Sequence, residues 1–367
     1  MRLVPAMSVL VVLAAFACKA AESQGGVKLE RKLPVTFGQI SNVVELGDGR
    51  IAFADTRNKL FITADLASGK TDTLGSRVDS LPASAPAGQY KFPGWVAHLA
   101  GDTIALVDFA AQRTTLWSEK GEPISVVTTV KAAGPEPVLV YDTVGNGYKI
   151  DYKAVIGGGE IGRVFHPDSI PVLRIGLKAG KVDTVAHLRA PEYGSATFGE
   201  QSQEAVKVFS PNDFFGVLLD GTAWVARGNE NRVDWRAADG KWMQGKSRDY
   251  TKVPVTQADR ERVLAQVRER GKEHGMPQEL KIEYPFAETK PPFDFALASP
   301  NGDIWLQRPR AQEGSPLVYD VVNRSGGWLR EVTFPAGATL AGFGKGGALY
   351  ATIKEANGLR SVGRFKV

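Results

Sequence analysis

The chain has 367 residues, of which 43% are hydrophobic and 23% charged, so it can bury a sizeable core as two ordinary domains or one large all-β domain. Its 45 basic and 40 acidic residues leave a formal charge of +5, and no stretch concentrates basic residues as nucleic-acid binding requires. The single cysteine excludes an intrachain disulfide framework and a multi-thiolate metal site.

The first 18 residues have the pattern of an export signal. Arg2 is a short basic region, and the apolar run over residues 9–17 is too short to cross a bilayer as a helix. The sequence Ala-Phe-Ala precedes Cys18, and this segment resembles a bacterial lipoprotein cleavage box. The resemblance implies that Cys18 becomes the lipidated first residue of the mature protein. The alternative is ordinary signal-peptidase cleavage, which leaves Cys18 as a free thiol.

Residues 19–26 are small and polar, as in a short tether. Together with the signal they predict an exported protein, either periplasmic or attached to the outer membrane through a lipid anchor on Cys18. No transmembrane helix is expected in the mature chain.

The segment after the tether, residues 27–37, is predicted to be a strand without a hairpin partner nearby. Residues 43–74 contain four short strands separated by turns such as Asp48-Gly49, and residues 95–130 repeat this plan. Short apolar strands at this spacing, with Asp-Gly and Ser-Gly turns, indicate an all-β sandwich, barrel or propeller.

Four further units follow, over residues 138–188, 214–245, 294–334 and 339–367. The third is interrupted by an insertion over residues 153–169, and the sixth has only three strands. Pairing the lone strand 27–37 with the sixth unit completes that unit and leaves fewer exposed strand edges. The sequence therefore predicts an all-β, six-bladed β-propeller over residues 27–367, closed by the N-terminal strand. A two-sheet sandwich is the alternative, but it does not explain why the four-strand pattern returns six times.

One surface helix is predicted over residues 256–274, with Thr256 as its N-cap and Asp259 in its first turn. Its apolar stripe is narrow and its other positions are mostly charged, so it contributes little to the core. The helix is an insertion between the fourth and fifth units. It could cover one mouth of the propeller, dock a partner, or be a tolerated insertion.

The phrases DGRIAFAD, DGTAWVARGNENRV and NGDIWL resemble the NHL-like six-bladed propellers of bacteria. Asn58-Lys59, Gln112-Arg113 and Asn231-Arg232 lie where that family carries Asn-Arg. The resemblance covers most of residues 27–367 and, with the N-terminus, implies a propeller lipoprotein. It is specific for the fold and says little about function, because one fold hosts many activities.

Metal ligands are one class of candidate site residue. Enzymes with this resemblance include metal-dependent lactonases and other hydrolases, whose calcium-type sites gather oxygen ligands from different blades at one channel mouth. The candidates here are Asp55, Asp108, Asp213 and Asp294. For Asp55, Asp108 and Asp213 the alternative is a structural role in a turn.

Arginines are the second class of candidate site residue. Arg227 and Arg308 occupy, in the fourth and fifth units, the place that Asp55 and Asp108 hold in the first two. Two arginines on neighbouring blades can clamp a carboxylate or phosphate bidentately. The alternative is that each pairs with a nearby acidic side chain. No histidine set and no serine-nucleophile motif indicates a catalytic centre.

These features predict a ligand-binding or protein-interaction module of the cell envelope. The expected partners are an envelope protein or a small anionic or sugar-like ligand, together with the membrane through the lipid anchor, and no nucleic acid. No cofactor is predicted for this function. The alternative is a metal-dependent hydrolase or lactonase at the channel mouth, for which calcium is the expected ion.

Overall fold

The computed structural model describes residues 25–99, 103–127, 138, 140–151, 167–176, 180–237, 239–273, 275–277, 279–310, 312 and 314–367. The predicted export signal, Cys18 and residues 19–24 of the tether lie outside these ranges, as does most of the predicted 153–169 insertion. In the described part of the chain, no helix has both the length and the apolar composition needed to cross a membrane.

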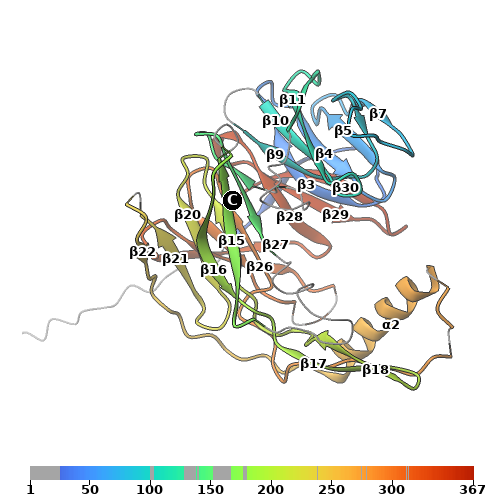
Figure 1. The fold of residues 1–367 in the computed structure, drawn as a ribbon, viewed down its shortest axis with the longest axis vertical. Helices are drawn as coiled ribbons and strands as arrows, with labels where there is room; N and C mark the ends of the chain where they lie inside the picture. Colours follow the sequence, from blue (N-terminus) through green and yellow to red (C-terminus); the bar gives the residue numbers. More distant parts are fainter. Residues whose placement is uncertain are drawn as a thin grey trace, which may run out of the picture.

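Among the described residues, six antiparallel sheets follow one another in sequence, and in each of them consecutive strands are hydrogen-bonded neighbours (Figure 1). The first two sheets contain β3 (Ile40–Glu45), β4 (Ile51–Asp55), β5 (Leu60–Ala64) and β6 (Thr71–Thr73), then β9 (Pro93–His98), β10 (Thr103–Asp108), β11 (Arg113–Ser118) and β12 (Pro123–Val127). The third and fourth contain β13 (Val140–Tyr141), β14 (Asn146–Ile150), β15 (Ser169–Gly176) and β16 (Val182–Arg189), then β19 (Phe214–Val217), β20 (Ala223–Arg227), β21 (Arg232–Arg236) and β22 (Trp242–Met243).

The fifth and sixth sheets continue this arrangement. They contain β24 (Phe295–Ala298), β25 (Ile304–Gln307), β26 (Leu317–Val322) and β27 (Trp328–Phe334), then β28 (Ala338–Phe343), β29 (Leu349–Lys354) and β30 (Arg360–Lys366). A 3-10 turn, η2 (Lys345–Gly347), joins β28 to β29, and the short strands β7 (Ser76–Arg77) and β8 (Gln89–Tyr90) pair between the first and second sheets.

The N-terminal segment adds strands to the last two sheets. β1 (Gly25–Gly26) pairs in parallel with β27, and β2 (Lys28–Lys32) pairs antiparallel with β30 as the outermost strand of the sixth sheet. The next residue, Leu33, donates its backbone N–H to the carbonyl oxygen of Val362 at 2.9 Å. The tether predicted over residues 19–26 is therefore too long, because Gly25 and Gly26 already belong to a sheet.

The hydrophobic core lies between neighbouring sheets. All five residues of β4 are buried, because the second strand of a sheet is covered on both faces. Clusters of buried residues join each sheet to the next, as Phe61 and Trp117 do for the first and second. A further cluster, which contains Val43 and Tyr350, joins the sixth sheet back to the first. The packing of the six sheets is therefore cyclic.

Two insertions come together outside the six sheets. A hairpin of β17 (Tyr193–Phe198) and β18 (Gln201–Val206) follows the third sheet, while α2 (Gln257–Glu273) and β23 (Ile282–Glu283) follow the fourth. β23 pairs with β17, and Figure 1 shows the hairpin close to α2, away from the first sheet. We call these four elements the arm. The helix predicted over residues 256–274 is confirmed as α2, and the hairpin is an unexpected addition.

Candidate functional site

The two arginines predicted to bind an anionic ligand make ion pairs within the protein. Arg227, at the end of β20, contacts Asp213 at 2.7 Å and Asp234 at 3.1 Å. Arg308, just after β25, contacts Asp320 at 2.7 Å and a further carboxylate on β27. The hydrogen bond to Asp320 is the main reason that the pKa of Arg308 is raised. Both guanidinium groups already have carboxylate partners, so a ligand would have to compete with these ion pairs. Ligand binding by Arg227 and Arg308 stays a prediction.

Asp55 and Asp108, two of the predicted metal ligands, hold loops in place. The carboxylate of Asp55 accepts hydrogen bonds from the backbone N–H groups of Gly38 at 2.9 Å and Gln39 at 3.1 Å, and from Asn58 Nδ2 at 2.7 Å. Asp108 accepts equivalent hydrogen bonds from the loop before β9. Both residues are buried. These contacts are those of structural aspartates, which satisfy backbone donors that would otherwise be buried without a partner.

Asp213 and Asp294, the other two candidates, lie just before the first strands of the fourth and fifth sheets. Asp213 accepts the backbone N–H of Arg189 at 2.9 Å in addition to its ion pair with Arg227. The carboxylate of Asp294 accepts a hydrogen bond from Gln307 Nε2 at 2.8 Å. The residue as a whole is exposed, but the protein around its carboxylate limits hydration and so raises the pKa of Asp294. Within the described ranges, no three His, Cys, Asp or Glu side chains form a group able to hold a metal ion.

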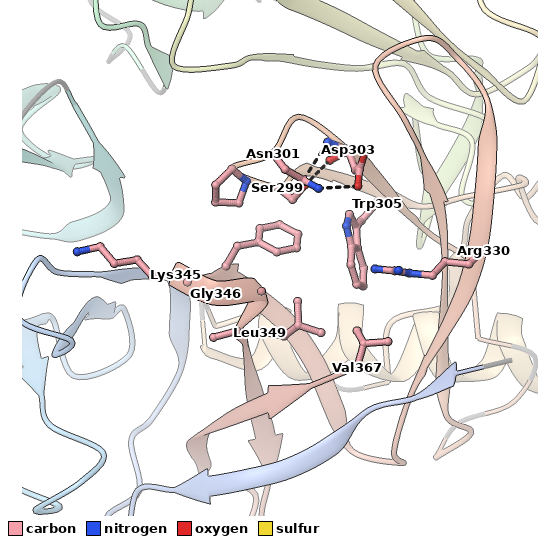
Figure 2. A pocket seen from close by; sticks show the side chains of 14 residues that line it. Ser299, Asn301, Asp303, Trp305, Arg330, Lys345, Gly346, Leu349 and Val367 are labelled. Carbon is pink, nitrogen blue, oxygen red and sulfur yellow. Dashed lines mark hydrogen bonds between the residues drawn. The ribbon is translucent and has the colours of Figure 1, made fainter. Parts of the chain in front are cut away.

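A hollow of about 430 Å³ lies between the fifth and sixth sheets. It is found at the end of these sheets where the turn between β24 and β25 approaches the turn between β28 and β29 (Figure 2). None of the residues predicted as sites from the sequence lines this hollow. Its chemistry therefore has to be derived from the residues that do.

The floor of the hollow is apolar and is fixed by core packing. Trp305, on β25, is only 3% exposed, and its ring centroid lies 5.4 Å from that of Phe343 on β28 in an edge-to-face arrangement. Leu349 and Val367 extend this apolar surface (Figure 2). Because the aromatic pair is held between two sheets, the floor is formed before any ligand arrives.

One rim of the hollow is polar and comes from the turn over residues 299–303. Asn301 Nδ2 donates to Asp303 Oδ2 at 2.9 Å, and Ser299 Oγ donates to the backbone oxygen of Asp303 at 3.0 Å. Gly302 adopts a φ of +90°, a conformation that favours glycine, and so permits the tight turn. The turn thus holds an amide and a carboxylate at the edge of the hollow, where ligand hydroxyl groups can meet them.

Two cationic side chains border the hollow, and they are engaged differently. Lys345 Nζ donates to the backbone oxygen of Gly47 at 3.1 Å and points away from the hollow in Figure 2. Arg330 lies on β27 opposite Val321, which is itself opposite Trp305, so these three residues share one face of the sheet.

Arg330 is the cation available to a ligand. It is exposed, and it makes no ion pair or hydrogen bond with any residue in the part of the chain that the structure describes. Figure 2 shows its guanidinium group beside Trp305 at the edge of the hollow. A cation next to an apolar floor is a setting in which a ligand's negative charge is paired while the rest of the ligand is desolvated.

Part of this site carries a signal in the sequence. The turns at Asn301-Gly302 and Gly346-Gly347 occupy the same place in successive units, so both are expected at the same end of neighbouring sheets. Arg330 carries no such signal, because a lone arginine on a polar outer strand is usually an ordinary surface residue. Only the register of β25, β26 and β27 places it beside Trp305.

Comparisons with known proteins support the fold and leave the family open. No protein-family model matches the chain, and no curated protein matches it. A solved structure of a member of the DUF4221 family from Bacteroides vulgatus is 11% identical over 93% of this chain and 97% of its own, with a TM-score of 0.50. At this identity the likeness concerns the fold alone.

Two further solved structures are similar over nearly the whole chain. A luciferin-regenerating enzyme is 12% identical over 93% of this chain and 96% of its own, with a TM-score of 0.46. A gluconolactonase from Xanthomonas campestris is 13% identical over 91% and 88%, with a TM-score of 0.44. These scores are too low to carry an argument about activity.

Proposed function

We propose that the six sheets are the blades of a six-bladed β-propeller that binds a small anionic, sugar-like ligand. The cyclic packing of the sheets and the pairing of β2 with β30 support a ring closed by the N-terminal strand. The binding proposal depends on one observation. Arg330, a cation without an ion pair among the described residues, lies beside the aromatic floor of the hollow.

The hollow offers three kinds of surface that suit a sugar acid. The apolar face of a sugar ring would pack on Phe343 and Trp305, its hydroxyl groups would reach Asn301 and Asp303, and its carboxylate would pair with Arg330. A planar guanidinium group is well matched to a carboxylate, because two parallel N–H groups can meet two oxygens. The volume of about 430 Å³ is in the range of small-molecule sites.

Isothermal titration calorimetry with glucuronate and glucose tests this proposal, because the two sugars share a ring and differ in the carboxylate. Glucuronate should bind more tightly. Arg330→Gln should weaken glucuronate binding about tenfold to a hundredfold, the value of a hydrogen bond between charged groups. The same variant should leave glucose binding unchanged.

A matched control is Arg268→Gln, which removes an exposed arginine from α2, outside the hollow. It should leave both affinities as they are in the parent protein. The proposal fails if glucuronate and related uronates do not bind, if glucose binds as tightly as glucuronate, or if Arg330→Gln binds glucuronate as well as the parent does.

We also propose that the protein is exported and anchored through a lipid on Cys18. The support is the sequence of the first 18 residues, which combines a basic start, a short apolar run and a cysteine after small residues. Growth of a bacterial host with alkyne-tagged palmitate should label the parent protein and leave Cys18→Ser unlabelled. A parent protein without label would favour ordinary signal-peptidase cleavage instead.

A further inference from the structure

Basic residues gather on the two outer strands of the sixth sheet. β2 has the sequence KLERK and β30 the sequence RSVGRFK. Together these strands carry six basic residues and one acidic residue, a net charge of +5. We call this pair of strands the basic edge.

The basic edge accounts for the whole net charge of the protein. The chain has 45 basic and 40 acidic residues, so removing the six basic residues and one acidic residue of the basic edge leaves 39 of each. Two segments more than 300 residues apart in the sequence are brought together here by the pairing of β2 with β30. The pairing therefore places a net charge of +5 on two adjacent strands.

The register of the basic edge places like charges directly opposite one another. Lys28 is opposite Lys366, and Arg31 is opposite Arg364. Cross-strand neighbours share a face of the sheet, and like charges in this position destabilise it. Such an arrangement costs stability in the isolated protein, and an anionic surface facing it would offset that cost.

Acidic side chains neutralise only part of the basic edge. Glu30 contacts Arg364 at 3.4 Å, and Glu355 contacts Lys32 at 2.7 Å. Asp65, in the turn after β5, has its pKa lowered mainly by hydrogen bonds from Ser68 and Ala67 and least by the charge of Arg31. Lys28 and Lys366 are exposed and make no ion pair with any residue of the described ranges. The end that holds the lysine pair therefore carries unpaired charge, and Arg31 and Arg360 likewise have no ion pair within those ranges.

Apolar side chains are exposed at the same end. Leu29 is 44% exposed and Val367 is 48% exposed, and they follow Lys28 and Lys366 in the sequence. Successive residues of a strand point to opposite faces, so Leu29 and Val367 lie on the other face from the lysine pair, and only a surface that approaches the open edge of β2 meets both. Apolar groups at the acyl boundary with cations at the headgroups are the combination by which peripheral proteins contact lipid. A nucleic acid would use the cations and leave the apolar groups in water.

The short distance in sequence between Cys18 and the first described residue also favours a membrane-facing position for the basic edge. Gly25 is seven residues after Cys18 in the sequence and lies next to Val367. Seven residues span at most about 25 Å when fully extended. A lipid on Cys18 would therefore hold the basic edge within a short distance of the bilayer.

We propose that the basic edge is a membrane-facing surface that binds anionic phospholipid headgroups. This inference does not require the ligand proposed for the hollow, although Val367 lines the hollow and also lies beside the basic edge. It also stands without the lipid on Cys18, because the charges and the exposed apolar side chains belong to the folded chain itself.

Vesicle co-sedimentation tests the proposal with the full chain carrying Cys18→Ser. Two kinds of vesicle are used, phosphatidylcholine alone and phosphatidylcholine mixed with phosphatidylglycerol. The apolar run near the N-terminus contributes equally to both, so the difference between them reports binding that depends on charge. We expect tighter binding to the anionic vesicles, and a decline as salt is added, because salt screens exposed charges.

The decisive variant reverses both unpaired lysines, Lys28→Glu with Lys366→Glu. One basic residue near an anionic membrane is worth about a fivefold change in partitioning, so this variant should lose the anionic preference by about a hundredfold or more. The control, Lys252→Glu with Lys272→Glu, makes the same change in net charge at exposed positions outside the basic edge, one of them on α2. It should keep most of the preference.

Three results would overturn the proposal. The first is equal binding of the parent to both kinds of vesicle, and the second is an equal loss in the control and in the Lys28→Glu, Lys366→Glu variant. The third is binding of a DNA oligonucleotide that is as tight as vesicle binding and is abolished by the same two substitutions, because this would identify a general polyanion site. Matching melting temperatures of the variants and the parent establish that all are folded.

Discussion

An aspartate at the end of the second strand of a sheet holds the loop that precedes the first strand of that sheet. Asp55 is 1% exposed and accepts hydrogen bonds from three backbone N–H groups, those of Gly38, Gln39 and Asn58, and from the side chain of Asn58. An ionised carboxylate suits this place because it accepts at both oxygens and donates at neither. The recurrence of aspartate at this point of the repeat is therefore explained by architecture.

Removal of this carboxylate should be costly. Asp55→Ala should lower the free energy of unfolding by about 3 kcal/mol, because several donors lose their acceptor inside the protein. Urea unfolding followed by tryptophan fluorescence measures the change. Asp72→Ala, at an exposed position on β6, is the matched control and should change stability by less than about 0.5 kcal/mol. A loss no larger than that of the control would show that the loop before β3 is held by other contacts.

Calcium should leave the melting temperature unchanged. Asp55, Asp108 and Asp213 already accept hydrogen bonds from backbone or guanidinium groups, and calcium needs six to eight oxygen ligands, so it would have to displace these donors. Thermal unfolding with EDTA, then with excess calcium, and with magnesium as a comparison, measures the response. A rise with calcium alone would reveal binding to the native state and favour the hydrolase alternative.

The repeat pattern locates Arg227 and Arg308 correctly within their sheets but does not show their partners. Arg227 pairs with Asp234, and Arg308 with Asp320, across to the third strand of the same sheet. Which side chains share a face depends on the register between strands, and one residue of slip would reverse it. The sequence therefore indicates where a cation is placed, and the structure is needed to show that it is neutralised.

The arm is held to the rest of the protein by a buried ion pair. Lys290 is 1% exposed, and its Nζ lies 2.9 Å from Asp259 Oδ1 near the start of α2. Thr256 Oγ1 also donates to Asp259, at 2.8 Å. Burial alone would raise the pKa of Asp259, but hydrogen bonds from Lys290, Thr256 and Arg262 outweigh it and hold the pKa far below its ordinary value.

Asp259→Asn should loosen the arm and leave the six sheets intact. Breaking a buried ion pair by removing one partner costs about 3–5 kcal/mol, because the remaining charge is left in a poor environment. Hydrogen–deuterium exchange should show faster exchange across α2, with exchange in β4 and β25 unchanged. Glu261→Gln, at an exposed position of the same helix, is the control. Equal exchange in both variants would mean that other contacts hold the arm.

The same ion pair should make the arm sensitive to acid. The pKa of Asp259 is lower in the folded protein than its unfolded value of about 4, so its contribution to stability is present above that pH and declines as the pH falls below it. Protection of α2 in the parent should therefore decrease between neutral pH and about pH 3, once corrected for the intrinsic exchange rate. In Asp259→Asn the decrease should be much smaller. An equal decrease in both proteins would assign the acid sensitivity to other groups.

The two parts of the arm differ in how far the sequence predicts them. α2 carries an N-cap, an acidic first turn and a glycine beyond its end, all of which are local signals. The hairpin of β17 and β18 has a largely exposed second strand, with the sequence QSQEAV, and so lacks the apolar alternation that marks a strand. The hairpin is stabilised by the pairing of β17 with β23, which is a contact between segments far apart in the sequence.

At the scale of the whole molecule, the sequence predicts the pairing of its two ends through a missing strand. The sixth unit has three strands of its own, and β2 supplies a fourth beside β30. The sequence does not predict the charge of the resulting surface, because neither KLERK nor RSVGRFK is unusual alone. The hollow is not predicted from the sequence either, because the residues that line it, such as Trp305 and Lys345, belong to different units.

If the N-terminal strand is part of one cooperative fold, its anchoring residue should matter for the whole protein. Leu33 is fully buried in the cluster between the first and sixth sheets, so Leu33→Ala should lower the free energy of unfolding by about 2–5 kcal/mol. Leu29→Ala removes the same atoms from a side chain that is 44% exposed and should cost less than about 1 kcal/mol. Equilibrium urea unfolding measures both, and a single transition with an unchanged slope would show that the ends unfold with the rest. Equal losses in the two variants, or a separate early transition in the parent, would mean that the N-terminal strand is an accessory to a ring that is stable without it.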